Sequence, residues 1–263
     1  MPEGPEIRRA ADRLDAYVTG KPLIELELPD WVDADSTALR DSGITAVRTH
    51  GKLMWVEFGT GHALTIHLQL YGRWRFGRVE PAMSRSRRAA FVGPQGGGWL
   101  YSATDVYLLP PGVSPERPRG LDPLHPETTA ATLATRLLAS PRRQIGSQLL
   151  DQNVVAGIGN YLRCDALFLA GVAPERRAID LSESRLNALA EALLRLSRRS
   201  LATTGITINS ELFADERAAR IPRRFARHYV YGRAGHPCRS CGRPITRETI
   251  AARPFYACRH CQR

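Results

Sequence analysis

Residues 1–18 read MPEGPEIRRAADRLDAYV and set the first element of the fold. The apolar residues of this stretch recur at helical spacing: Ile7, Ala10, Ala11, Leu14 and Val18. Gly20 follows them as a stop signal, so residues 5–18 are predicted to form an amphipathic helix. The residues before it are unusual because two prolines and two carboxylates stand within the first six positions.

Pro2 is a candidate nucleophile, because a methionine before proline is normally trimmed and a free secondary amine remains. An α-amino group has a pKa of about 7.7–8.0, so part of it is unprotonated at neutral pH. Its attack on an aldehyde carbon gives an iminium ion, which accepts electrons. Glu3 and Glu6 stand beside it and suit proton transfer. The same residues also fit a plain helix start, where proline is tolerated and acidic groups favour the helix dipole.

From Leu23 to Leu109 the sequence changes to short runs that are rich in β-branched and aromatic residues. The clearest runs are residues 23–28, 52–58, 63–70, 72–79 and 99–102. Several are separated by glycine-containing turns, and this pattern predicts an antiparallel sandwich or barrel. Six prolines then fall between residues 110 and 126, which excludes regular structure and predicts an interdomain linker.

Beyond the linker the pattern is helical, over residues 127–139, 160–170 and 183–202. Ser182 is the expected N-cap of the last helix, and Leu181 with Leu186 forms a hydrophobic staple. Residues 206–227 lack such a pattern and are predicted to be a mobile loop. That loop carries five arginines: Arg217, Arg220, Arg223, Arg224 and Arg227.

Four of the five cysteines form two Cys-x2-Cys pairs, Cys238 with Cys241 and Cys258 with Cys261. Two such pairs let four thiolates converge on one ion, and in a reducing compartment they favour a metal over disulfides. Since the protein fills all four positions, the sequence predicts that one Zn²⁺ is bound in a structural role. No organic cofactor is implied. The tail from residue 229 onward is predicted to be a small β-hairpin that needs this staple to fold. Cys164 is left over as a small core residue.

The charge balance favours a polyanion as partner. The chain has 37 Lys and Arg against 26 Asp and Glu, a formal net charge of +11. A general preference of the sequence for arginine would give the same excess of positive charge. Such a preference leaves few lysines by accident, so the only two, Lys21 and Lys52, are worth inspecting. No apolar run reaches the roughly 20 residues that span a bilayer, and no signal-peptide pattern opens the chain. The sequence therefore predicts a cytosolic protein without membrane association.

Five ordered motifs resemble the formamidopyrimidine-DNA glycosylase and endonuclease VIII superfamily, and the resemblance covers essentially the whole chain. These motifs are residues 1–12, His50-Gly51-Lys52, Gln69-Leu70-Tyr71-Gly72, Gly157-Ile158-Gly159-Asn160-Tyr161, and Arg253-Pro254-Phe255-Tyr256 with the cysteine pairs. The resemblance implies a bifunctional DNA glycosylase and abasic-site lyase that acts on damaged DNA as a monomer in the bacterial cytosol. The reaction is base excision followed by β,δ-elimination in base excision repair.

The resemblance also implies roles for individual residues. Pro2 would attack C1′ of the damaged nucleoside and form a Schiff base. Glu3 would protonate the ring oxygen and shuttle protons, with Glu6 supporting this network. Lys52 would bind phosphate and assist β-elimination, unless it is an ordinary surface lysine.

Three positions in the second half of the chain are implied to contact the DNA backbone. Asn160 would grip phosphates with help from backbone amides, and its alternative role is a helix N-cap. Arg253, at the tip of the hairpin, would clamp the same phosphate region. Arg119 in the linker is a further candidate for a phosphate contact.

The residues Gln69, Leu70 and Tyr71 resemble the wedge that endonuclease VIII inserts into the duplex. Eversion of a base costs a few kcal/mol, and a side chain that fills the vacated space offsets this cost. The alternative is that Leu70 and Tyr71 simply end a strand in the core.

The implied fold is α+β. Residues 1–110 would form a catalytic β-sandwich domain flanked by helices, and residues 111–126 a linker. Residues 127–227 would form a helix–two-turn–helix domain with the arginine-rich loop, and residues 228–263 a zinc-finger hairpin.

Oxidised pyrimidines are the predicted substrates. The alternatives are a formamidopyrimidine-DNA glycosylase that prefers oxidised purines and a non-catalytic DNA-damage binder. Two features depart from the family pattern. Asp165 stands where the family usually has Glu, and the loop 206–227, which lies where relatives contact the everted base, resembles neither main branch closely.

Overall fold

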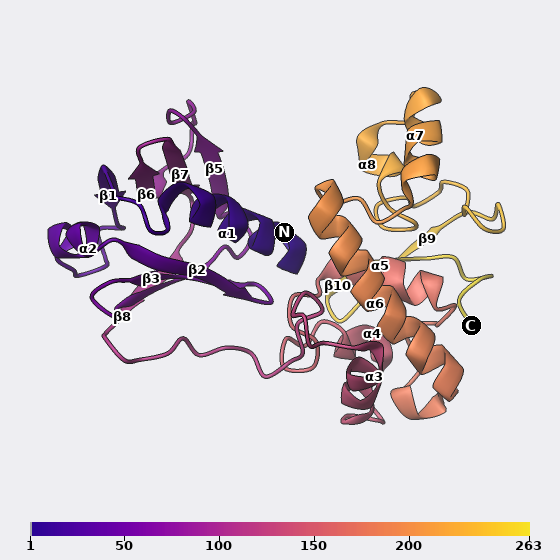
Figure 1. The fold of residues 1–263 in the computed structure, drawn as a ribbon. Helices are drawn as coiled ribbons and strands as arrows, with labels where there is room; N and C mark the ends of the chain where they lie inside the picture. Colours follow the sequence, from indigo (N-terminus) through magenta and orange to yellow (C-terminus); the bar gives the residue numbers. More distant parts are fainter. Residues whose placement is uncertain (1) are drawn as a thin grey trace. The chain divides into compact units, whose positions relative to one another are not determined.

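The computed structural model describes residues 2–263, so the expected removal of Met1 lies outside the described residues. The chain divides into two compact units, Met1–Arg117 and Pro118–Arg263. The division falls inside the proline-rich stretch 111–126, which contributes no helix or strand to the described part of the chain (Figure 1).

The first unit is built from strands with two helices. Its elements are α1 (Gly4–Val18), β1 (Glu25–Glu27), α2 (Ser36–Ser42), β2 (Ile44–His50), β3 (Leu53–Phe58), β4 (Ala63–His67), β5 (Arg73–Gly77), β6 (Arg87–Gly93), β7 (Gly96–Tyr101) and β8 (Asp105–Leu109). The strands form two four-stranded antiparallel sheets, in the orders β1-β6-β7-β5 and β2-β3-β4-β8.

Helix α1 contacts strands of both sheets and buries its apolar face in their common core. Ile7, Leu14 and Val18 are among the residues of that core, as the helical spacing requires. The predicted helix and the predicted sandwich are therefore confirmed. The run 63–70 is the main difference, because strand β4 ends at His67 and a tight turn follows.

The second unit is mainly helical and ends in a hairpin. Its elements are α3 (Ala130–Leu138), α4 (Ile145–Gln148), α5 (Asn160–Leu169), the short 3-10 helix η1 (Ala178–Asp180), α6 (Glu183–Thr203), α7 (Ser210–Ala218), α8 (Arg223–Ala226), β9 (Thr246–Ile250) and β10 (Arg253–Ala257). Helix α6 packs on α3 and α5, and α5 also contacts β10. Nowhere in residues 2–263 is a helix both long enough and apolar enough to cross a bilayer.

The start of α6 follows its sequence signals. The Ser182 hydroxyl accepts a hydrogen bond from the Arg185 backbone amide at 3.4 Å, which satisfies one free amide of the first turn. Leu181 and Leu186 are both buried at this end, so the predicted N-cap and staple are confirmed.

The predicted mobile loop over residues 206–227 is wrong, because this stretch forms α7 and α8. Asn209 caps α7 by accepting the Leu212 amide at 2.8 Å, and Pro222 precedes the first turn of α8. None of the residues of α7 is buried. The helix therefore lacks the apolar periodicity from which a helix is recognised in a sequence.

Candidate functional site

Pro2 lines a cavity of about 280 Å³ in the first unit. The walls come from α1, the turn before β5, and β5 itself. The lining residues are Pro2, Glu6, Arg9, Ala10, Arg13, Leu68, Gly72, Arg73, Trp74, Arg75 and Phe76. The structure thus brings Pro2 and Glu6 to one cavity, beside the turn that carries residues 69–71.

Glu3 and Glu6 form a capping box at the start of α1. The Glu3 side chain accepts the Glu6 backbone amide, and the Glu6 carboxylate accepts the Glu3 amide at 3.0 Å. The plain helix-start interpretation is therefore also realised. Glu3 is buried and is not among the residues that line the cavity, whereas Glu6 faces it and lies 3.8 Å from the Arg9 guanidinium.

Four arginines make the wall of this cavity basic: Arg9, Arg13, Arg73 and Arg75. The Arg13 guanidinium lies over the Phe76 ring at 4.7 Å from its centroid, and Arg75 donates to the Trp74 carbonyl at 3.0 Å. A cavity that combines a carboxylate with four guanidinium groups suits a phosphorylated ligand.

The turn at residues 68–72 exposes the three predicted wedge residues. The Gly72 amide donates to the Leu68 carbonyl at 2.8 Å and closes the turn. A Cβ at Gly72 would lie 2.6 Å from that carbonyl oxygen, so glycine is required here. Leu70 is 53% exposed and Tyr71 is 69% exposed. The alternative interpretation, in which both end a strand in the core, is therefore wrong.

Lys52 lies in the turn between β2 and β3 and is not among the residues that line the Pro2 cavity. Burial lowers the pKa of His67, Asp105 opposes this shift, and the positive charge of Lys52 adds to it. Lys52 is therefore close to His67, whose Nδ1 lies 3.6 Å from an Asp105 carboxylate oxygen. The same carboxylate accepts the Gln69 side-chain amide at 3.1 Å and links this cluster to the turn at residues 68–72.

In the second unit, Asn160 ties the start of α5 to the hairpin. Its side-chain amide donates to the Pro254 carbonyl at 2.6 Å, and its Oδ1 accepts from the Arg163 guanidinium at 2.5 Å. Gly159, not Asn160, is the N-cap of α5, so the N-cap alternative for Asn160 is wrong. Asn160 therefore lies next to Arg253, the residue before Pro254, whose side chain is exposed.

The four paired cysteines lie together, with their Sγ atoms all within 4.8 Å of one another. Cys238 and Cys261 are 3.9 Å apart, and Cys241 and Cys258 are 3.4 Å apart. Four sulfurs at about 2.3 Å from a tetrahedral ion are separated by roughly 3.8 Å. These residues can hold a metal ion, and they join the hairpin to the core of the second unit through Cys238 and Cys258.

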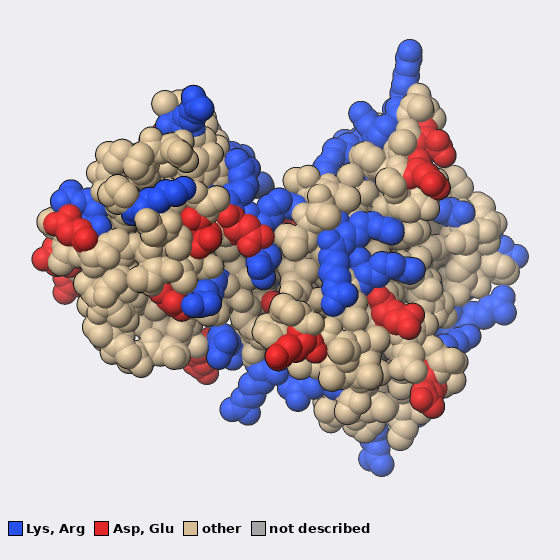
Figure 2. Space-filling model, viewed as in Figure 1, with Lys and Arg blue, Asp and Glu red and all other residues tan. Residues whose placement is uncertain are grey.

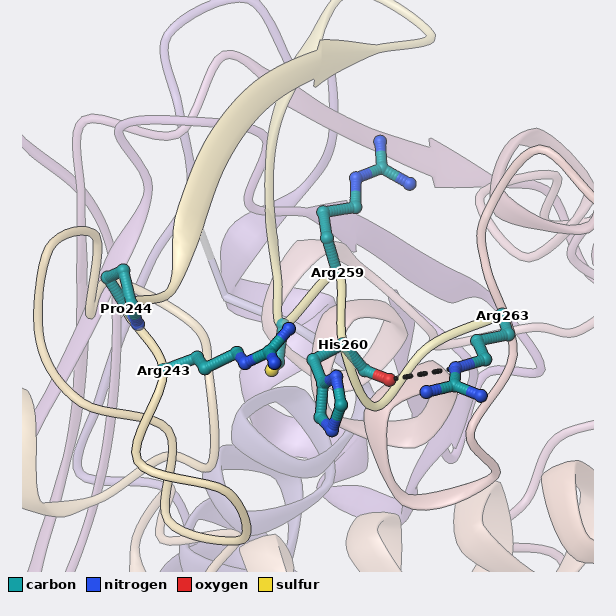
Figure 3. A pocket seen from close by; sticks show the side chains of 6 residues that line it. Arg243, Pro244, Arg259, His260 and Arg263 are labelled. Carbon is teal, nitrogen blue, oxygen red and sulfur yellow. Dashed lines mark hydrogen bonds between the residues drawn. The ribbon is translucent and has the colours of Figure 1, made fainter.

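A second cavity, of about 290 Å³, lies beside this cluster and is lined by Arg243, Pro244, Cys258, Arg259, His260 and Arg263 (Figure 3). Arg259 is already engaged by the carboxylates of Glu175 and Glu248. Basic side chains outnumber acidic ones on the surface seen in Figure 2, in agreement with the net charge of +11.

Comparison with known proteins identifies the family. The formamidopyrimidine-DNA glycosylase N-terminal domain matches residues 1–100, and the formamidopyrimidine-DNA glycosylase H2TH domain matches residues 119–211. Relatives named Endonuclease 8 from Escherichia coli and Klebsiella pneumoniae are 39% and 37% identical, over the full length of both chains. The chain belongs to the formamidopyrimidine-DNA glycosylase and endonuclease 8 family.

Solved structures agree with this assignment. MutM from Thermus thermophilus is 31% identical and superposes with a TM-score of 0.76, covering 99% of this chain and 98% of that one. MutM in complex with DNA that contains carbocyclic 8-oxo-G is 23% identical, with a TM-score of 0.78 and 99% coverage of both chains, and shows likeness of fold. The expected α+β architecture with a C-terminal cysteine cluster is thus that of the family.

Asp165 is fully buried in α5. Its carboxylate accepts the backbone amides of Tyr229, Val230 and Tyr231 at 2.9–3.1 Å. It also accepts the Thr207 hydroxyl at 2.5 Å. Asp165 therefore fixes the backbone that leads from α8 to residues 238–261, the segment with the four paired cysteines, which we call the cysteine ribbon.

Several residues of the site were missed from the sequence. Positions 2, 6, 9 and 13 fall on one face of a helix, and positions 73 and 75 on one face of a strand. These spacings could have grouped the four cavity arginines with Pro2.

Proposed function

We propose that this family member excises oxidised pyrimidine bases through a Schiff base on Pro2 and then cleaves the strand by β,δ-elimination. The enzyme class, a DNA glycosylase with abasic-site lyase activity, is that of the family to which the chain belongs. Its partner is damaged DNA, which a MutM structure of the same fold contains. We expect a monomer in the bacterial cytosol.

The position of Pro2 carries this proposal. Once Met1 is removed, its secondary amine faces a cavity wide enough for a sugar and lined by basic groups. Attack of the nitrogen on C1′ breaks the glycosidic bond, and the base leaves with the bonding electrons and a proton. Opening of the sugar ring gives the iminium ion. Loss of the C2′ proton and then of the C4′ proton expels the two phosphates in turn.

Glu3 and Glu6 are proposed to manage the protons. Backbone hydrogen bonds hold both carboxylates at the helix start, within one turn of Pro2. A carboxylate held in place is a better proton donor and acceptor than a mobile one. Glu3 would protonate the ring oxygen as the sugar opens, and Glu6 would order the cavity side of the network.

Phosphate contacts are proposed for Lys52 and, in the second unit, for Asn160 and Arg253. Lys52 stands beside His67 and would assist β-elimination as a phosphate-bound cation. Asn160 anchors the hairpin turn, so it positions the exposed Arg253 as well as the amides that open α5. These three residues would fix the position of the protein along the DNA backbone without recognising the base sequence.

The wedge is proposed to be Leu70 and Tyr71. Both are exposed on a turn whose two ends, Leu68 and Gly72, line the Pro2 cavity. Gln69 is held on this turn by Asp105, in a left-handed backbone conformation with φ of 48°. An exposed apolar pair on a rigid turn suits insertion into the space that an everted base leaves.

The ion in the cysteine cluster is proposed to be one structural Zn²⁺. The spacing of the sulfurs fits a four-thiolate tetrahedron, and no position is left for a substrate or water. Such an ion stabilises the hairpin that carries Arg253.

Two alternatives are less well supported. Relatives named Endonuclease 8 match the full chain at 37–39% identity, which favours the pyrimidine-preferring branch over a purine-preferring formamidopyrimidine-DNA glycosylase. A non-catalytic binder would not need Pro2 at a cavity with Glu3 and Glu6 beside it.

The proposal is tested by borohydride trapping on DNA that contains an abasic site. Borohydride reduces the iminium ion, so the processed enzyme should be trapped as a covalent adduct. Pro2→Gly should weaken trapping severely, and a blocked N-terminus should abolish it. Lys52→Gln is the matched control, because it removes a different amine and should leave an adduct. Full trapping by protein that retains Met1 would show that Pro2 is not the nucleophile.

A further inference from the structure

Residues 225–231 connect α8 to the cysteine ribbon, and two buried charges hold this strip by its backbone. Asp165 accepts its amides, as described above, from the side of α5. Arg239 donates to its carbonyls from the side of the ribbon. The guanidinium reaches the carbonyls of Phe225 at 3.1 Å, Ala226 at 3.2 Å and His228 at 2.7 Å.

Arg239 also reaches α7. Its Nη2 forms an ion pair with Glu216 at 2.5 Å, and the Arg239 side chain is only 7% exposed. A single guanidinium therefore satisfies carbonyls at the end of α8 and a carboxylate in α7 at the same time. Arg239 lies between Cys238 and Cys241, so the cysteine ribbon fixes the position of its backbone.

Other contacts hold the segment 210–226 mainly at its base, where Ala226 is buried. None of the residues of α7 is buried, and in Figure 1 α7 and α8 lie together at one end of the second unit. The Thr207 amide donates to the Arg227 carbonyl at 2.9 Å, and the Arg223 guanidinium donates to the Thr204 carbonyl at 2.8 Å. The rings of Phe225 and His236 pack together with their centroids 4.4 Å apart. These contacts hold the base of the segment, whereas Arg239 is the buried charge that joins its two helices.

We infer that Arg239 is a positioning residue that fixes the segment 210–226 for recognition of the base to be excised. This inference rests on the proposed function and on the family resemblance, which places that segment where relatives contact the everted base. Arginine suits the task because its planar guanidinium carries five N–H donors, and a lysine ammonium cannot reach three carbonyls and a carboxylate together.

The inference predicts a split between the two activities of the enzyme. Excision needs a base held in place, so it should depend on the position of the segment 210–226. Cleavage at a preformed abasic site involves no base, so it should not depend on that position. A residue that only stabilised the whole unit would affect both reactions alike.

Limited trypsin digestion reports how often the segment opens to the protease, because its arginines provide the cleavage sites. Arg239→Ala should speed cleavage within residues 210–226 by about tenfold, since a hydrogen-bonded charge is lost and proteolysis follows the open fraction. Excision should fall, and cleavage at abasic sites should stay at the wild-type rate. The metal content should stay unchanged, because no ligand is removed.

Two further variants complete the test. Arg243→Ala is the matched control, because this arginine lies in the same ribbon but lines an open cavity (Figure 3). Its guanidinium makes no hydrogen bond or ion pair with any described residue, so digestion and excision should not change. Glu216→Gln removes only the ion pair with α7 and should give a smaller change in the same direction as Arg239→Ala.

Wild-type digestion of both Arg239→Ala and Glu216→Gln would overturn the inference, as would equal losses of excision and abasic-site cleavage. A failure of the proposed function would look different. The wild-type enzyme would then cut neither substrate, while the digestion of residues 210–226 would still report whether Arg239 holds the segment.

Discussion

At the scale of single residues, Asp165 shows how a buried carboxylate can organise backbone that is distant in sequence. Burial by itself would raise the pKa of Asp165, but hydrogen bonds from His228, Thr207 and the Val230 amide outweigh it and hold the pKa below its ordinary value. These partners lie 42 to 65 residues further along the chain. The charged form is thus the one that the fold stabilises.

Asp165→Asn should destabilise the second unit by about 3 kcal/mol, because an amide group would then face backbone N–H donors. The pH dependence has a definite sign. The folded pKa is lower than that of the unfolded chain, about 3.9, so the contribution of the carboxylate is complete above that pH. It is lost as the pH falls through the folded pKa. Urea unfolding at several pH values measures both effects, and an Asn variant as stable as the wild type would contradict them.

A matched variant is Asp165→Glu, which keeps the charge. Its additional methylene enters a fully buried site, so a smaller loss of about 1–2 kcal/mol is expected. The sequence marked Asp165 as a departure from the family. Its role could not be predicted, because the amides that it accepts belong to a segment without any local pattern.

At the scale of elements, the turn at residues 68–72 was anticipated only in part. Its motif was recognised, but the sequence placed Leu70 inside a strand, since apolar residues alternate up to that position. Residues 68–72 instead form a tight turn, in which a Cβ at Gly72 would collide with the Leu68 carbonyl oxygen. The strand therefore ends earlier, and Leu70 is exposed. Patterns with buried partners, such as α1 and α6, were predicted well. The helix α7, which buries none of its residues, was not.

Leu70→Ala should leave stability within about 0.5 kcal/mol of the wild type, because the side chain is exposed. It should slow base excision more in duplex than in single-stranded DNA, because only the duplex leaves a hole to be filled. Excision rates on matched single- and double-stranded substrates provide the measurement. Ile24→Ala, at another exposed apolar residue, is the control and should change neither rate. Equal losses in both substrates would remove Leu70 from the wedge.

At the scale of the whole molecule, the two units have separate cores, so loss of the metal should affect them differently. Cys241→Ser should lose the ion and with it the order of the hairpin that carries Arg253, and DNA binding should fall. The first unit should stay folded. Metal content, DNA affinity at fixed salt and circular dichroism test this expectation. Cys164→Ala is the control and should keep the metal, because Cys164 is a core residue outside the cluster. Unchanged DNA binding by metal-free protein would exclude the hairpin from the binding surface.

Substrate choice also belongs to the whole molecule, because the proposed wedge lies in the first unit and the proposed base-recognition segment 210–226 lies in the second. A damaged pyrimidine has lost aromatic stacking, so its eversion costs less and requires less from a pocket. 8-Oxoguanine keeps an intact ring system that stacks well, and its selection needs hydrogen bonds to its edge from a shaped cap. The segment 210–226 offers four arginines and two short helices, which suit phosphates and polar fragments better than a large planar purine.

We therefore expect faster excision of 5-hydroxyuracil, dihydrouracil and thymine glycol than of 8-oxoguanine from matched duplexes. Arg239→Ala should narrow this difference, because a loosened segment discriminates less between bases. The lesions should be compared under single-turnover conditions, so that product release does not hide the excision step. If 8-oxoguanine opposite cytosine is removed faster than every pyrimidine lesion, then the arginine-rich helices must form a purine cap on DNA. The assignment to the pyrimidine-preferring branch would then be wrong, although the Pro2 chemistry, which is common to both kinds of base, would stand.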